Sequence, residues 1–202
     1  MRGSTSILSI PKLLIMDPAT FRDGYIIRDQ YALHFLTFTV CGWIDLFTRQ
    51  CYRNIILDSF QYCRSNKGLL LHAYVVMSNH IHVIMQSKGQ YSLSDIIRDF
   101  KKYTCKSILE IVQTDVESRR LWMLHQFAYY GSRHAKRQDY QIWTNNSHPE
   151  AIYTRNFLLS KLNYTHQNPV RAGWVSAPEN YLYSSASNYT TGSGLIDVDL
   201  LF

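Results

Sequence analysis

The sequence predicts an α+β fold of the ferredoxin-like, split βαβ type, with an antiparallel central sheet and an added C-terminal helix. The order of the predicted elements favours this class, and the composition and the length indicate a single folded domain. Aromatic and β-branched runs alternate with amphipathic segments in the order β-α-β-β-α-β. The composition, 46% hydrophobic and 18% charged, is that of a folded protein. A chain of 202 residues is long enough to bury one substantial core.

The first half of the chain supplies three strands and one helix. The run YALHFLTFTVCGW (31–43) is rich in aromatic and β-branched residues and predicts a strand. A helix is predicted over 49–68 and ends in Lys67-Gly68. LLLHAYVVM (69–77) predicts the second strand, and after a tight turn IHVIMQ (81–86) predicts the third. The apolar residues of the helix recur at helical spacing: Tyr52, Ile55, Ile56, Phe60 and Cys63.

A second amphipathic helix is predicted over 92–112. Ser92 and Asp95 resemble a capping box at its start. Its apolar stripe consists of Leu93, Ile96, Ile97, Phe100 and Ile108. YQIWT (140–144) predicts a weaker fourth strand.

The last helix is predicted from about 154 to 168, where Pro169 stops it. Residues 1–24 are interpreted as an N-terminal extension and 25–202 as a single domain with a C-terminal tail. The four cysteines form no CxxC pair, which indicates a reduced, cytoplasmic protein. No apolar run approaches the roughly 20 residues that a transmembrane helix needs.

His80 and His82 stand one residue apart in the predicted third strand. Because side chains alternate along a strand, these two histidines share one face while Ile81 and Val83 point to the other. Two imidazoles on one face can bind a single divalent cation. The alternative is a pair of hydrogen-bonded, half-buried histidines, and the pattern alone does not decide between the two.

Tyr164 and Asn168 lie four residues apart in the predicted last helix, so they stack on one face about 6 Å apart along its axis. The apolar residues Leu158, Leu159 and Leu162 lie on roughly the opposite side. Tyr164 is therefore not obviously placed for burial, and Asn168 offers a neutral oxygen to a metal. The alternative is an ordinary surface tyrosine beside an Asn-Pro helix stop.

Together, YVVMSNHIHVIMQ and YTHQNPVRAGWV resemble the single-tyrosine HUH transposases, specifically the REP-associated (RAYT-like) branch. The likeness extends through YSLSDIIRDFKKYT, YQIWTNNSHPEAIYT and PENYLYSSASNY, so it covers nearly everything after residue 25. The resemblance implies that Tyr164 is the catalytic nucleophile on the C-terminal helix. It implies that His80, His82 and Asn168 are the metal ligands.

The implied activity is metal-dependent nicking and joining of single-stranded or hairpin DNA. Tyr164 would attack a DNA phosphate, form a 5′-phosphotyrosine intermediate and release a 3′-OH. The implied cofactor is Mg²⁺ or Mn²⁺; imidazole suits transition metals better than magnesium, so manganese should be at least equally competent in vitro. The enzyme would be a monomer or a homodimer, with the monomer favoured, and would have no membrane partner.

Positive charge is concentrated in one region. Nine Lys or Arg stand between residues 98 and 137 against four acidic residues, which accounts for nearly all of the net charge of +6. A phosphate-binding track is the favoured interpretation and a solvated helix face the alternative. The DNA-binding candidates are Arg98, Lys101, Lys102, Lys106, Arg133, Lys136, Arg137, Lys161 and Arg171, and the region also holds Arg119 and Arg120.

Two other functions stay open at this point. The chain could be a domesticated hairpin DNA-binding protein whose cleavage is silent or restricted. It could also be a metal-dependent phosphodiesterase that transfers the phosphate to water without a covalent intermediate.

Overall fold

The computed structural model describes residues 26–133, 138–145 and 147–202. The predicted extension, residues 1–24, lies outside these ranges. Within them, no helix is both long and apolar enough to cross a membrane.

The centre of the molecule is a four-stranded antiparallel sheet with the order β2-β3-β1-β4. Its strands are β1 (His34–Thr39), β2 (Leu69–Val76), β3 (His80–Ser87) and the short β4 (Glu150–Ala151). This order is the one that a split βαβ arrangement produces, because α1 carries the chain from β1 past the place of β3 to β2. The predicted α+β class with an antiparallel central sheet is confirmed.

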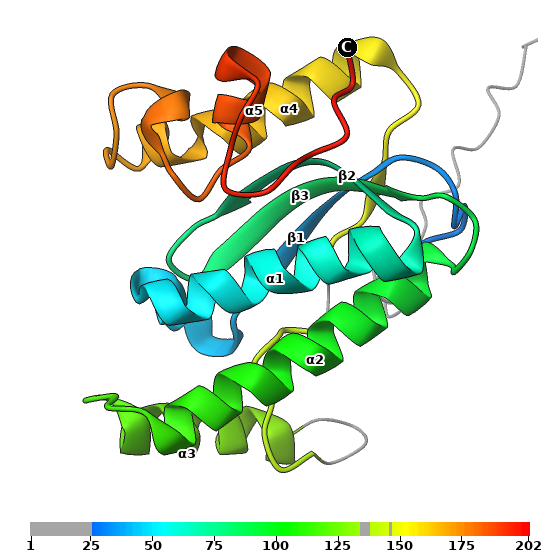
Figure 1. Cartoon of the computed structure of the whole chain (residues 1–202). Coiled ribbons are helices and arrows are strands. Elements are labelled where there is room, and N and C mark those ends of the chain that lie inside the picture. The colour runs from blue at the N-terminus through cyan, green and yellow to red at the C-terminus, as the bar shows by residue number, and fades with distance from the viewer. Residues whose placement is uncertain (1–25, 134–137, 146) are drawn as a thin grey trace, which may run out of the picture.

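Two helices, α1 (Gln50–Lys67) and α2 (Leu93–Thr114), cover one face of the sheet (Figure 1). Both begin and end close to the predicted residues. The Ser92 hydroxyl accepts the Asp95 N–H at the start of α2, as the capping box predicts. Gly68 ends α1 in the left-handed region (φ 65°), where a glycine carries no Cβ penalty. The largest side chains buried between these helices and the sheet include Phe38, Phe60, Tyr52 and Tyr74.

The helix α4 (Arg155–Arg171) covers the opposite face of the sheet (Figure 1). Its buried apolar contacts are few, with Leu162 packing on a small cluster of Phe35, Ala73, Ile84 and Ile152. The side chain of Thr154 caps the helix by accepting the N–H of Phe157. This side of the sheet is therefore less apolar than the side that α1 and α2 cover.

The predicted fourth strand at 140–144 is wrong. That segment meets the sheet only through a bridge between Trp143 and Val40, and the strand that pairs with β1 is β4, at Glu150–Ala151. The Trp143 side chain packs among core aromatics, and its indole N–H donates to Thr104 Oγ1 at 2.9 Å. Aromatic and β-branched residues at 142–143 thus reflect burial in the core rather than ladder pairing.

The predicted stop at Pro169 is also wrong, because α4 continues to Arg171. A proline there removes only one hydrogen bond near the end of the helix, so the cost is local. The helix ends two residues later. Gly173 (φ 74°) donates its N–H to Val170 O, and Trp174 donates to Pro169 O, which is the Schellman pattern.

Two further parts of the fold were not predicted. The helix α3 (Arg120–Ser132) packs beside α2, on the side away from the sheet (Figure 1). The chain runs along the outer edge of β2 twice, once between the short elements η4 (Pro178–Asn180) and α5 (Ala186–Thr191) and again after α5. There Val76 N–H donates to Tyr183 O at 2.9 Å and Asp199 N–H donates to Leu71 O at 2.7 Å. This segment covers an edge that would otherwise expose unpaired backbone groups.

Candidate active site

The two histidines of β3 lie on the face of the sheet that α4 covers. Their ring centroids are 4.8 Å apart. Ile81 and Val83, between and beyond them, are fully buried in the core on the other face. The alternation predicted from the sequence therefore holds, and it brings His80 and His82 together on the less apolar side.

Each imidazole is oriented by a neighbouring side-chain oxygen. His80 Nδ1 donates to Asn79 Oδ1 at 2.8 Å, and the amide orientation is fixed because Asn79 Nδ2 donates to Asp45 Oδ1. His82 Nδ1 shares a hydrogen bond with Thr37 Oγ1 at 2.9 Å, across from it on β1. Metal-binding histidines commonly have one ring nitrogen held in this way, which leaves the other free to ligate. Nε2 is that atom in both rings.

The electrostatic surroundings keep both rings neutral. Burial lowers the pKa of His80. For His82, which is 5% exposed, burial lowers the pKa most, and repulsion from a protonated His80, from Lys161 and from Arg171 adds to the effect, so that the pKa falls to about 3. Neutral imidazole is the form that binds a metal ion, so the pair is ready to ligate at neutral pH.

Tyr164 of α4 lies directly against His82. The ring centroids are 5.0 Å apart in an edge-on arrangement, and Phe35 lies 5.9 Å away on the same side. Tyr164 is 39% exposed, so a ligand from solvent can reach it. The Arg171 guanidinium lies 4.4 Å from the Tyr164 ring centre and donates to the Tyr164 carbonyl at 2.9 Å.

Lys161 and Asn168 flank Tyr164 by about one helical turn on either side. Lys161 Nζ pairs with Glu150 Oε1 at 2.6 Å and lies 4.4 Å from the Phe35 ring centre. Asn168 is half-buried. In the part of the chain that the structure describes, no hydrogen bond joins its amide to either imidazole.

The donor chemistry fits a divalent ion. Among residues 26–133, 138–145 and 147–202, no group of three His, Cys, Asp or Glu could hold a metal. An ion at His80 and His82 would therefore need Asn168, water or substrate oxygens to complete its ligands. Two imidazoles with oxygen ligands suit Mn²⁺ at least as well as Mg²⁺.

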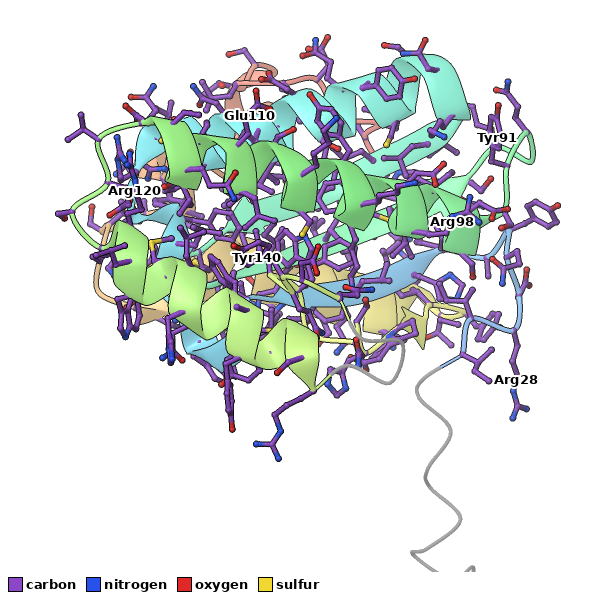
Figure 2. All side chains as sticks on the ribbon, turned by 90° about the horizontal axis from the view of Figure 1, so that it is seen from below. Arg28, Tyr91, Arg98, Glu110, Arg120 and Tyr140 are labelled. Atoms are coloured by element: carbon purple, nitrogen blue, oxygen red, sulfur yellow. The ribbon has the colours of Figure 1, made fainter. Side chains whose placement is uncertain are left out.

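Most of the predicted DNA-binding residues lie far from this site. The basic residues of α2 are on the opposite side of the sheet from α4 (Figure 1), and Figure 2 views that side, with Arg98 and Glu110 on α2 and Arg120 at the start of α3. Among the predicted residues that the structure describes, only Lys161 and Arg171 accompany the histidines. The structure does not bring the predicted basic track and the histidine pair together on one face.

The basic residues on the α2 and α3 side differ in their exposure and in the partners that they contact. Arg98 pairs with Asp95 and Asp99. Lys101 donates to the Thr144 carbonyl at 3.0 Å, and burial lowers its pKa to about 8. Lys102 and Lys106 are exposed, and Arg133 contacts Tyr129. Lys136 and Arg137 lie outside the described residues.

Thr37 and Asn79, which orient the imidazoles, were not predicted as site residues. Asn79 was interpreted only as part of a turn, although an amide directly before His80 is a signal that could have been used. Thr37 becomes visible only through the register of β1 against β3. His166 donates to or accepts from Ser185 Oγ at 2.8 Å, which agrees with a packed histidine rather than a ligand.

The fold places the protein in the class of α+β domains with a four-stranded antiparallel sheet. Residues 30–148, more than half of the chain, match the family described as "Transposase IS200 like". The chain therefore belongs to the IS200-like transposase family. The family resemblance inferred from the sequence is confirmed.

Two solved structures are similar in fold. A REP-associated tyrosine transposase bound to a REP hairpin is 20% identical, with 88% of this chain and 92% of that chain covered and a TM-score of 0.54. A Deinococcus radiodurans R1 protein classed as a transposase is 12% identical over 72% of this chain and 95% of that one, with a TM-score of 0.42. Only the first carries weight, and it supports the fold. No curated protein matches the sequence.

Proposed function

We propose that this chain is a metal-dependent transposase that nicks and joins single-stranded DNA through a covalent bond to Tyr164. Membership of the IS200-like family supports the general activity, DNA transposition. The observation that carries the finer proposal is the contact between Tyr164 and His82, with ring centroids 5.0 Å apart and His80 adjacent. A nucleophile and a pair of neutral metal-binding groups can then act on one phosphate.

In the proposed reaction, Tyr164 Oη attacks the phosphorus atom and the P–O3′ bond breaks. The 5′-phosphotyrosine bond forms, and the proton lost by the phenol is balanced by the proton that the leaving 3′ oxygen gains. A 3′-OH can reverse the step and rejoin the strand, so no further reactant is required. The 39% exposure of Tyr164 is consistent with a strand that enters from solvent.

Five other residues would support this step. His80, His82 and Asn168 would hold a divalent ion, and that ion would supply positive charge to the scissile phosphate. Lys161 and Arg171, on either side of Tyr164, would neutralise the flanking phosphates. For Lys161 this requires the DNA to compete with Glu150, its ion-pair partner at 2.6 Å.

The substrate that we propose is a DNA hairpin with a single-stranded flank. The similar REP-associated transposase was solved bound to a REP hairpin, and this chain has the same fold. Tyr164 contacts His82 of its own chain, which supports a monomer acting in cis. Light scattering would measure the mass in solution, and an obligate dimer would contradict this part of the proposal.

A covalent-trapping assay tests the function directly. End-labelled hairpin DNA from the flanks of the protein's own gene is incubated with Mn²⁺ or Mg²⁺ and analysed on a denaturing SDS gel. We expect a metal-dependent adduct that Tyr164→Phe abolishes while DNA binding persists. Tyr153→Phe is a matched control, because Tyr153 is 75% exposed and lies just before α4.

Three results would contradict the proposal in different ways. An adduct that survives Tyr164→Phe would remove this residue from the reaction. Cleavage with no adduct at any time would indicate transfer to water. Binding with neither adduct nor cleavage, for several flanking hairpins, would indicate a silent DNA-binding descendant.

A further inference from the structure

An exposed tryptophan lies beside the candidate active site. Trp43 ends the short turn η2 (Cys41–Trp43), directly after β1 leaves the sheet. Its ring meets that of His80 edge-on, with the centroids 6.0 Å apart. Trp43 is nevertheless 65% exposed, whereas Trp143 in the core is 5% exposed. Because tryptophan is on average a well-buried residue, a largely bare indole next to His80 calls for an explanation.

The backbone at this tryptophan is in an unfavourable conformation. Trp43 has φ 54° and the preceding Gly42 has φ 66°, so two consecutive residues occupy the left-handed region. Glycine accepts this conformation without penalty, and a Cβ at residue 42 would also meet Tyr130 Oη at 3.0 Å. A bulky L-residue such as Trp43 rarely adopts it. Residues held in such conformations cluster at functional sites.

The same amide that orients His80 also holds this strained turn. Asn79 Nδ2 donates to the Trp43 carbonyl at 3.3 Å, and Asn79 Oδ1 accepts from His80 Nδ1 at 2.8 Å. The Trp43 N–H donates to Val40 O at 3.1 Å and closes the turn. The backbone that carries the indole is thus fixed relative to His80.

We propose that Trp43 is a stacking platform for the nucleobase next to the scissile phosphate. This inference rests on the proposed function, which brings that phosphate to His80, His82 and Tyr164. A nucleotide held there would carry its base into reach of an indole in contact with His80. Aromatic side chains bind single strands by stacking on bases of any sequence, because every base has a π-face.

A nucleobase explains the surroundings better than a protein partner does. The nearby cations Lys161 and Arg171 favour a polyanion, and the chain as a whole has a net charge of +6. The turn η2 and the C-terminal end of α4 lie at the same end of the sheet (Figure 1). A strand passing Tyr164 toward that end of α4 would therefore pass the turn that carries Trp43.

The test measures binding in a Tyr164→Phe background, so that cleavage does not interfere. The probe is the trapping hairpin with 2-aminopurine placed in turn at each single-stranded position. We expect one position to be quenched by the protein, and Trp43→Ala to abolish that quenching and weaken binding about tenfold. Trp43→Phe should retain most of the affinity. Trp122→Ala, a 49% exposed tryptophan on α3, should change neither signal.

If Trp43 had a purely structural role, replacing it should lower the Tm and leave the DNA affinity unchanged; stacking on a base predicts the opposite. Trp43→Gly relieves the positive φ, so we expect its Tm to equal or exceed that of the wild type while DNA affinity falls. A clear drop in Tm with unchanged affinity would overturn the proposal. So would unchanged affinity accompanied by a change of mass in light scattering, because that result would assign Trp43 to a contact between two copies.

Failure of this inference can be separated from failure of the proposed function. In otherwise wild-type protein, Trp43→Ala should slow adduct formation at limiting DNA in proportion to the affinity that it loses. A collapse of that rate with normal affinity would mean that Trp43 acts through His80, which overturns stacking. If the wild type forms no adduct but the Trp43-dependent quenching persists, stacking stands and the catalytic proposal fails.

Discussion

The two faces of the sheet differ in what covers them. On the α1 and α2 side, residues such as Leu36, Phe38 and Ile81 are fully buried in a large apolar core. On the α4 side, the buried apolar cluster has five members among the described residues, and His82 is buried next to them. Polar groups are costly to bury unless they are hydrogen-bonded. The comparison indicates that the α1 and α2 face provides most of the apolar burial that stabilises the fold, whereas the α4 face carries the candidate active site.

The largest expected effect is the loss of stability when a leucine is replaced by alanine, and it should differ between the two faces. Leu36→Ala, in the centre of the sheet, should lower the free energy of unfolding by about 3–5 kcal/mol. Leu162→Ala, on α4, should lower it by about 2–3 kcal/mol, because a small and partly open cluster can relax around the lost atoms. Urea unfolding measures both values. Equal losses would mean that the α4 side is packed as fully as the other.

A smaller effect concerns acid stability on the α4 side. Burial lowers the pKa of His166 to about 4, against about 6.5 in an unfolded chain. Between these values the unfolded state binds a proton that the native state does not, so stability falls as the pH drops. The contribution should be complete above about pH 6.5, and about 3 kcal/mol of stability should be lost by pH 4.

His166→Gln is the variant that isolates this effect. His166 faces Ser185 and Tyr189 of the C-terminal segment, and glutamine can keep a polar contact there. Urea unfolding from about pH 8 to pH 4 should show the variant losing less stability in acid than the wild type. Parallel curves for the two proteins would show that His166 does not carry this acid sensitivity.

The next effect separates orientation of the metal ligands from stability. Thr37→Val keeps the shape of the side chain but removes the hydroxyl that bonds His82 Nδ1. We expect adduct formation or apparent metal affinity to fall about tenfold, as is usual for partners of metal ligands, with Tm little changed. Thr39→Val is the control, since Thr39 lies opposite His80 in the register. Equal rates for the two variants would remove Thr37 from the site.

The smallest expected effect is on the salt dependence of DNA binding, and it shows which face of the sheet contacts phosphate. Lys161→Gln with Arg171→Gln should lower the salt slope of binding by about 1.4, even for a strand of about eight nucleotides. Lys102→Gln with Lys106→Gln, on the α2 side, should act only on longer hairpins that reach that side. Binding titrations at several salt concentrations measure the slopes. An effect of the α2 pair on the short strand would reverse this assignment.

The sequence predicted those parts of the fold whose local signals agree with their environment. The capping box at Ser92, the glycine after α1 and the alternation around His80 each depend on near neighbours. The helix α3 was missed because Leu121 and Trp122 are exposed while Met123 and Phe127 are buried, so apolar residues surround it without forming a stripe. Its position is decided by tertiary packing, which periodicity does not reveal.

The site was predicted in the same uneven way. His80, His82 and Tyr164 follow from residue type, spacing and family resemblance, and the fold brings their rings together. Thr37 is 45 residues from His82 in sequence, and only the pairing of β1 with β3 joins them. The basic residues of α2 were grouped with the histidines because charge was counted along the sequence, which does not distinguish the two faces of a sheet.

The segment that covers the edge of β2 affects the order in which the chain folds. Tyr74 and Ser185 bond to each other although they are 111 residues apart in sequence. During synthesis at 5–20 residues per second, the interval between the synthesis of β2 and that of the segment that covers its edge is on the order of ten seconds. Until then the strand presents an open edge to other nascent chains. Synonymous codons that slow translation of the last part of the gene would therefore increase aggregation, although the amino-acid sequence is unchanged.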